Sequence, residues 1–172
     1  MRTGRRVRLL KEKIKNLNAL KKIILRLKEK GKKIVFTNGC FDLLHYGHVK
    51  YLEDAKRKGD ILVVAINSDT SVRKLKGNKR PIVNQKDRLG LIAALESVDY
   101  VVLFNEETPL KAIKELKPDI LVKGADWDRK QIVGSGIVLG YGGNVSTIKL
   151  IEGRSTTNLI KKIAKIFQNQ GY

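Results

Sequence analysis

Cysteine is almost absent from this 172-residue chain, which contains a single one, Cys40. One cysteine excludes an internal disulfide and any zinc site built from several cysteines, and it is typical of proteins of a reducing compartment. Long hydrophobic runs are also missing, because the longest uncharged stretch, residues 131–148, is rich in glycine and polar residues. Prolines are few and no low-complexity tract or repeat is visible, which argues against disorder. We therefore expect a cytoplasmic protein with no membrane segment.

Acidic residues are scarce: 17 Asp and Glu oppose 36 Lys and Arg, for a formal net charge of +19. Such an excess raises the question of nucleic-acid binding. However, residues 1–33 hold 14 of the basic residues and only 2 of the acidic ones, so the excess is mainly an N-terminal feature. Aromatic residues make up 6% of the chain and do not alternate with basic ones, as they do in platforms that stack on bases. A basic nucleic-acid-binding module is thus a remote alternative, and we expect no nucleic-acid partner.

The basic N-terminal segment nevertheless has an apolar side. Apolar residues recur there at helical spacing: Leu20, Ile23, Ile24 and Leu27. The pattern predicts a helix over residues 19–30, with Asn18 as its N-cap and Gly31 at its end. We therefore expect residues 1–30 to form a basic helical segment that packs on a domain spanning residues 31–172.

After residue 31, short apolar runs alternate with amphipathic stretches. The runs predict strands that begin near residue 34 and cover residues 60–66, 100–104, 119–122 and 145–148. The stretches between and after them predict helices over residues 47–58, 84–98 and 156–167, and one that starts at Thr108-Pro109. Continuous apolar strands separated by helices indicate a parallel sheet covered on both faces. The fold class we expect is α/β: a Rossmann-like, five-stranded parallel sheet with helices on both faces.

The most informative stretch, residues 34–48, reads as a strand, a tight loop at Asn38-Gly39 and the start of a helix. In a parallel sheet such a loop lies at the carboxyl edge, where the helix N-terminus offers amide donors to an anion. His45 and His48 are the only histidines in the chain, and Gly47 between them removes a side chain that would block close approach. The simpler interpretation is two ordinary surface histidines. The functional one is a pair that donates to phosphate oxygens.

At this point the sequence resembles a known family. The His-x-Gly-His element at 45–48, preceded by Asn-Gly-Cys-Phe-Asp at 38–42, is similar to the signature of the cytidylyltransferase-like nucleotidyltransferases. A second block, Gly-Arg-Ser-Thr-Thr-Asn-Leu-Ile at 153–160, resembles their Ser-Thr-Thr motif. Two ordered motifs about a hundred residues apart are far more specific than either alone. The resemblance implies that an acceptor phosphate attacks the α-phosphorus of a nucleoside triphosphate in line, and that Mg²⁺ is bound with that triphosphate.

Within the family, the motifs are most similar to adenylyltransferases that act on heptose 1-phosphate. This implies ATP and a sugar 1-phosphate as substrates, ADP-heptose and pyrophosphate as products, and a homodimer or higher homo-oligomer. Cytidylyltransferases for glycerol 3-phosphate or an aminoalcohol phosphate, and FAD synthetases, share the histidine element and remain alternatives. Leu150 stands where glycerol-phosphate enzymes carry an arginine, while Arg154 directly precedes Ser155. This departure weakens the glycerol interpretation.

The resemblance also assigns roles to residues. Catalytic roles go to His45, His48 and Lys76. Nucleotide or phosphate binding goes to Asn38, Gly39, Cys40, Phe41, Gly47, Lys74, Arg88, Gly124, Asp126, Arg154, Ser155, Thr156 and Thr157. Acceptor binding goes to Asp42, Asn67, Asp69, Arg80, Lys123 and Trp127. No side-chain metal site is expected.

Three of these regions have simpler interpretations. Residues 72–81 are either a solvated basic loop or a mobile flap over a triphosphate, and the resemblance favours the flap. Trp127 is either a buried structural residue or part of a wall for nucleotide or sugar. Ser155 is either only an N-cap of the last helix or, together with the amides there, a phosphate ligand.

Overall fold

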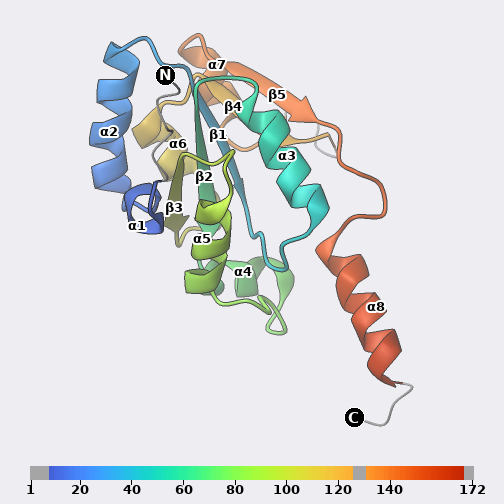
Figure 1. Cartoon of the computed structure of the whole chain (residues 1–172). Coiled ribbons are helices and arrows are strands. Elements are labelled where there is room, and N and C mark those ends of the chain that lie inside the picture. Colours follow the sequence, from blue (N-terminus) through green and yellow to red (C-terminus); the bar gives the residue numbers. More distant parts are fainter. Residues whose placement is uncertain (1–7, 126–130, 169–172) are drawn as a thin grey trace, which may run out of the picture.

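The protein, in a computed structural model that describes residues 8–125 and 131–168, forms a parallel sheet covered by helices (Figure 1). The sheet has the order β3-β2-β1-β4-β5. Its strands are β1 (Ile34–Gly39), β2 (Ile61–Asn67), β3 (Tyr100–Phe104), β4 (Ile120–Gly124) and β5 (Asn144–Ile148). All of its pairings are parallel. The expected α/β fold with five parallel strands is thereby confirmed.

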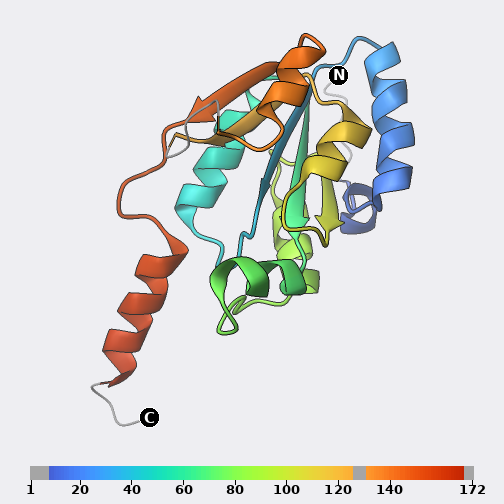
Figure 2. The same cartoon turned by 180° about the vertical axis from the view of Figure 1, so that it is seen from behind.

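The helices are α1 (Leu10–Lys13), α2 (Leu17–Glu29), α3 (Tyr46–Lys56), α4 (Asp69–Lys76), α5 (Gln85–Ala94), α6 (Leu110–Leu116), α7 (Ser135–Gly140) and α8 (Thr156–Gln168). Helices α2, α6 and α7 cover one face of the sheet, and α3 and α5 the other (Figures 1 and 2). The buried side chains of the two groups form separate clusters. Alternate residues of each strand supply the two faces, as with Val63 and Val64 of β2. This explains why the strands are apolar throughout.

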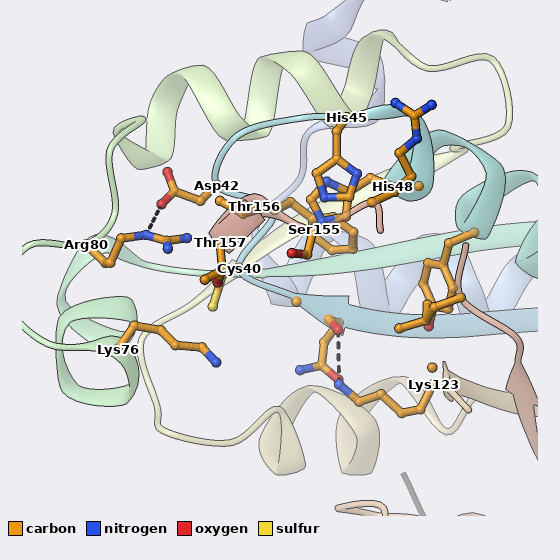
Figure 3. Close-up of a pocket in the computed structure, with 18 residues that line it drawn as sticks. Cys40, Asp42, His45, His48, Lys76, Arg80, Lys123, Ser155, Thr156 and Thr157 are labelled. Carbon is orange, nitrogen blue, oxygen red and sulfur yellow. Dashed lines mark hydrogen bonds and ion pairs between the residues drawn. The ribbon is translucent and has the colours of Figure 1, made fainter. Parts of the chain in front are cut away.

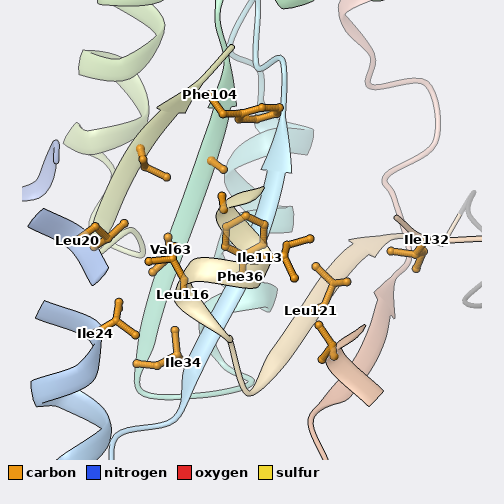
Figure 4. Packing of buried hydrophobic residues seen from close by; sticks show 14 of the residues in the cluster. Leu20, Ile24, Ile34, Phe36, Val63, Phe104, Ile113, Leu116, Leu121 and Ile132 are labelled. Atoms are coloured by element: carbon orange, nitrogen blue, oxygen red, sulfur yellow. The ribbon is translucent and has the colours of Figure 1, made fainter. Parts of the chain in front are cut away.

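The apolar side of α2 is buried against the sheet. Leu20 and Ile24 are fully covered beside Ile34, Phe36 and Val63 (Figure 4). The helix begins earlier than we predicted, because Asn16 rather than Asn18 is its N-cap and accepts a hydrogen bond from the amide of Ala19.

Our prediction for residues 72–81 was wrong in its first half, because residues 72–76 belong to α4. Ser68 caps this helix by accepting from the amide of Ser71, and Gly77, with φ of +87°, ends it. Val72 is fully buried and anchors the helix to the body. The N-cap serine and the terminal glycine can both be recognised in the sequence, but the dense basic charge between them suggested a loop.

Smaller differences concern helix ends. Helix α6 starts at Leu110 with Pro109 as its N-cap. We predicted Thr108 as the N-cap, so the helix begins one residue later than expected. Helix α5 is shorter than predicted, since Asn84 caps it and Leu95 already has an extended backbone. Helix α7 was not predicted, because six residues between glycines give too little periodicity to recognise.

The order of the strands places a crevice beside β1. From β1 the chain moves outward to β2 and β3, and it then returns to the other side of β1 for β4 and β5. The loops after β1 and β4 therefore leave in opposite directions at the carboxyl edge. Ligands of doubly wound sheets bind at such a point, which here lies at Gly39 and Gly124.

Helix α8 projects away from the sheet (Figures 1 and 2), and none of its residues is buried. It begins where the sequence predicted, with Ser155 accepting a hydrogen bond from the amide of Asn158 at 3.1 Å. Within residues 8–125 and 131–168, no helix is long and apolar enough to cross a membrane.

Candidate active site

A cavity of about 380 Å³ opens at the carboxyl ends of β1 and β4 (Figure 3). It is large enough for a small ligand, at the lower end of the usual range of about 300–1,000 Å³. The predicted site residues that line it are Asn38, Gly39, Cys40, Phe41, Asp42, His45, Gly47, His48, Lys76, Arg80, Lys123, Gly124, Arg154, Ser155, Thr156 and Thr157. They come from the stretch between the end of β1 and the start of α3, from the end of α4 and the loop after it, from the end of β4 and from the start of α8, so four distant segments of the chain meet in one place.

The two histidines are stacked at the start of α3. Their ring centroids lie 3.8 Å apart with an interplanar angle of 21°. His45 is the N-cap residue of α3, and its ring lies so close to Gly47 that a Cβ there would stand 3.0 Å from it. The ring of Phe41 meets His48 edge-on, at 5.2 Å between centroids. A side chain at position 47 would therefore crowd the ring of His45.

Both imidazoles are held neutral in this site. Burial, and to a lesser extent the nearby His45, lowers the pKa of His48 to about 4. Burial and the charge of Arg154 also lower the pKa of His45 below its ordinary value. Among the residues described, the Nδ1 atoms of both rings and Oδ1 of Asn38 are buried without a hydrogen-bond partner. Buried polar atoms normally have partners, so these three are available to bind a ligand or water.

The described part of the cavity wall carries four cationic side chains, Lys76, Arg80, Lys123 and Arg154. Figure 3 shows Lys76 and Arg80 on one side of the cavity and Lys123 on the other. The Nζ atom of Lys123 donates to the backbone carbonyl of Asn38 at 3.0 Å. Cations that converge from separate segments indicate a polyanionic ligand.

Among the described residues that line the cavity, Asp42 is the one carboxylate, and protein donors already occupy it. The amides of Ile82 and Val83 and the Nε atom of Arg80 donate to it at 2.5–3.0 Å. Burial alone would raise the pKa of this carboxyl, but the two amides and Arg80 outweigh that effect and hold the pKa below its ordinary value. Asp42 is thus ionised and fixed.

The start of α8 closes the cavity on another side. Ser155, directly before the 13-residue helix α8, lines the cavity there together with Thr156 and Thr157 of the first turn. The hydroxyl of Thr156 makes a long hydrogen bond, 3.5 Å, to the carbonyl of Leu43 in the β1–α3 loop. A helix N-terminus with hydroxyl groups favours phosphate oxygens.

The single cysteine, Cys40, does not have the properties of a nucleophile. Burial raises the pKa of the Cys40 thiol, and the nearby charges of Lys76, Arg88 and Arg80 only partly oppose this. The group therefore stays protonated near neutral pH. In the part of the chain that the structure describes, no group of three or more His, Cys, Asp and Glu could hold a metal ion.

Some predicted site residues do not line the cavity. Lys74 is exposed and extends toward Glu107, at 4.0 Å. Asn67 is buried and donates to the hydroxyl of Ser71. Asp69 forms an ion pair with Arg88, which is fully buried behind the β1–α3 loop. Asp126 and Trp127 lie outside the described residues.

Two residues of the cavity were missed by the sequence analysis, Tyr51 and Leu150. The hydroxyl of Tyr51 lies 2.7 Å from that of Thr37 and donates to the carbonyl of Val122. The signal was available for Tyr51, because it follows His48 by three residues and so shares its side of α3. Leu150 was noted only for its departure from the glycerol-phosphate enzymes.

Residues 36–163 match the family model described as cytidylyltransferase-like. Among curated relatives, the bifunctional protein HldE of Geobacter metallireducens is 56% identical over 155 residues, which cover 90% of this chain and 32% of the relative. HldE of Aliarcobacter butzleri is 53% identical over 150 residues, covering 87% and 31%. The chain thus spans about a third of the length of the curated relatives it matches.

Solved structures agree with this fold. The lipopolysaccharide core biosynthesis protein of Thermoplasma volcanium is 34% identical, with a TM-score of 0.58 over 70% of this chain and 98% of its own. The pantoate–β-alanine ligase of Francisella tularensis, solved in complex with β,γ-ATP and β-alanine, has a TM-score of 0.59 over 91% of this chain and 78% of its own. At 16% identity the second likeness concerns the fold alone.

Proposed function

Because the chain belongs to the cytidylyltransferase-like family, we propose that it is a nucleotidyltransferase that transfers AMP from ATP to a sugar 1-phosphate. Heptose 1-phosphate is the proposed acceptor, and ADP-heptose and pyrophosphate are the products. One observation carries the proposal: a stacked pair of neutral histidines, four cations and the hydroxyl-bearing start of α8 surround the same cavity.

The reaction is a single displacement. An oxygen of the acceptor phosphate forms a bond to the α-phosphorus of ATP, and the bond from that phosphorus to the oxygen shared with the β-phosphate breaks. Pyrophosphate leaves with the bonding electrons. A phosphate monoester is already largely ionised at neutral pH, since its second pKa is about 6, so the protein need not remove a proton. Its work is to place two anions in line and to stabilise the growing charge.

The proposed division of roles follows the cavity wall. His45 and His48 donate to the phosphoryl group under attack, because a neutral imidazole is a donor without the hydration of an ammonium group. Lys76 and Arg80 on one side and Lys123 on the other offset the charge of the two substrates. Ser155 and the residues after it hold the phosphates that leave.

Magnesium is expected to enter with ATP rather than to be held by a cage of side chains. The single carboxylate of the described cavity wall, Asp42, is occupied by three protein donors, which agrees with a metal bound mainly by phosphates and water. Bound in this way, it would neutralise part of the phosphate charge.

Support for a heptose acceptor comes from the motifs shared with heptose 1-phosphate adenylyltransferases and from the likeness to a lipopolysaccharide core biosynthesis protein. We place the reaction in the cytoplasm, where ATP is available. We also propose a homo-oligomer. Because Leu20 and Ile24 are buried in their own chain, the exposed Ile163 and Ile166 of α8 are the better candidates for contact with a second copy. If light scattering shows a monomer, the proposed homo-oligomer is excluded.

The function is tested by mixing the purified protein and Mg²⁺ with each nucleoside triphosphate and a panel of phosphates, and measuring pyrophosphate. The panel includes heptose 1-phosphate, other sugar 1-phosphates, glycerol 3-phosphate and FMN. The proposal predicts release that needs both ATP and heptose 1-phosphate. Release with CTP and glycerol 3-phosphate, or with ATP and FMN, would instead support the alternative enzymes.

A further inference from the structure

Phe41 has a backbone conformation that few large residues adopt. Its φ is +45°, in the left-handed region that favours glycine. Its ring is 6% exposed and packs in the cluster that contains Tyr51 and Leu52. The edge of the same ring contacts His48, at an interplanar angle of 64°. A strained residue persists only where its surroundings hold it, and such strain is frequent at functional sites.

The residues on both sides of Phe41 are held by one distant segment. The carbonyl of Cys40 accepts a hydrogen bond of 2.6 Å from Nη1 of Arg88. The carboxylate of Asp42 accepts from the amides of Ile82 and Val83, both at 2.8 Å. These tethers lie directly before and after Phe41, so they restrict the rotation of its backbone.

Arg88 connects three segments at once. It is fully buried, and besides Cys40 it donates to Oδ1 of Asp69 at 2.7 Å and to the carbonyl of Val83 at 2.9 Å. The planar guanidinium group supplies donors in a fixed fork, which a lysine cannot reproduce. Since Arg88 is not among the residues that line the cavity, a direct bond to a substrate phosphate does not fit its position.

We propose that Arg88 is a positioning residue: it holds Phe41 in the left-handed conformation, and the ring of Phe41 in turn fixes the imidazole of His48. The catalytic consequence of this role rests on the proposed function, while the structural coupling does not. Without Arg88, Phe41 relaxes toward negative φ, its ring leaves His48, and water reaches the imidazole.

The chain is well suited to a direct test, because its two histidines are the only ones to be observed by NMR. The variant is Arg88→Met, which keeps a long apolar chain and removes every donor. The matched control is Lys13→Met. Lys13 is also a buried cation, 8% exposed, and it donates at 2.9 Å to the carbonyl of Leu95, just beyond the other end of α5.

In Arg88→Met, the pKa of His48 is expected to rise from about 4 toward the ordinary 6.5, because burial is the main reason that it is low. The turnover number falls about tenfold to a hundredfold while KM for ATP changes little, since a small misplacement can cost up to about 10²-fold. In Lys13→Met both quantities stay at the wild-type values. An Arg88→Met protein with the His48 titration and turnover of the wild type overturns the proposal.

Two further variants carry the test if Arg88→Met does not fold. Arg88→Lys keeps the positive charge, and we expect it to show a smaller rise of the His48 pKa and a smaller fall in turnover than Arg88→Met. Phe41→Leu removes the aromatic ring that contacts His48 edge-on, and it should likewise raise the pKa of His48. An unchanged titration in both contradicts the coupling. A wild-type protein without transferase activity would refute the proposed function alone, because the NMR result does not depend on turnover.

Discussion

At the scale of single residues, the stacked histidines are the centre of the account. Each imidazole is neutral and has a buried nitrogen without a partner in the described chain. We predict that His45→Ala or His48→Ala lowers turnover by about 10²–10³-fold, the usual effect of removing one donor to developing charge. Steady-state kinetics, with circular dichroism as the control for folding, measure this. A change confined to KM would mean that the histidines bind without catalysing.

The low pKa of His48 also predicts how stability depends on pH. Between pH 6.5 and about 4 the unfolded chain binds a proton at this residue and the folded chain does not. The protein should therefore lose stability as the pH falls through this range, by on the order of 3 kcal/mol, since one pKa unit corresponds to about 1.4 kcal/mol. Urea unfolding of wild type and His48→Asn at pH 7 and 4.5 separates this effect from other groups. Parallel losses in both proteins would contradict it.

Sequence alone predicted most of the residues that line the cavity, but not all of their contacts. The histidine motif and the Ser155–Thr157 turn could be found because they are local patterns. Arg88 was predicted to bind phosphate, but it does not line the described cavity wall. Its hydrogen bond to Cys40 joins residues 48 positions apart and depends on how α5 packs, so no local pattern reveals it. Only the fold shows that its guanidinium group faces the protein.

At the scale of elements, α2 tests how the N-terminal segment is held. Leu20 is fully buried against the sheet, whereas Leu25 of the same helix is 53% exposed. We predict that Leu20→Ala lowers the free energy of unfolding by about 2–5 kcal/mol, as for other buried leucines. Leu25→Ala, the matched control, should stay within about 0.5 kcal/mol of the wild type. Equal effects, measured by urea unfolding, would mean that α2 is not docked in solution.

The segment from the end of α4 to Arg80 is a second test. Lys76 is exposed yet reaches the cavity, and Arg80 is already tied to Asp42. We predict that ATP with Mg²⁺ slows trypsin cleavage after Lys76 and Lys79, because triphosphate contacts would order this segment. AMP, which lacks the β- and γ-phosphates, serves as the control. Cleavage at the same rate with every ligand would leave no role for the segment as a flap.

At the scale of the whole molecule, the fold was predictable and the site partly so. Apolar strands at regular intervals determine a parallel sheet, and the switch in strand order beside β1 brings Asn38, His48 and Lys123 together. Helix α4 was not predicted, because the dense basic charge obscured its cap signals. The hydrogen bonds of Tyr51 to residues of β1 and β4 depend on tertiary packing, which no local pattern encodes.

The central claim is that AMP passes directly to the acceptor phosphate, without a covalent intermediate on the protein. It is tested by using ATP with a chiral phosphorothioate at the α-position and determining the configuration of the ADP-sugar formed. One in-line displacement inverts the configuration at phosphorus, and this is the result we predict. Retention would require two displacements, with His45, His48 or another group as a transient carrier of AMP, and would contradict the account.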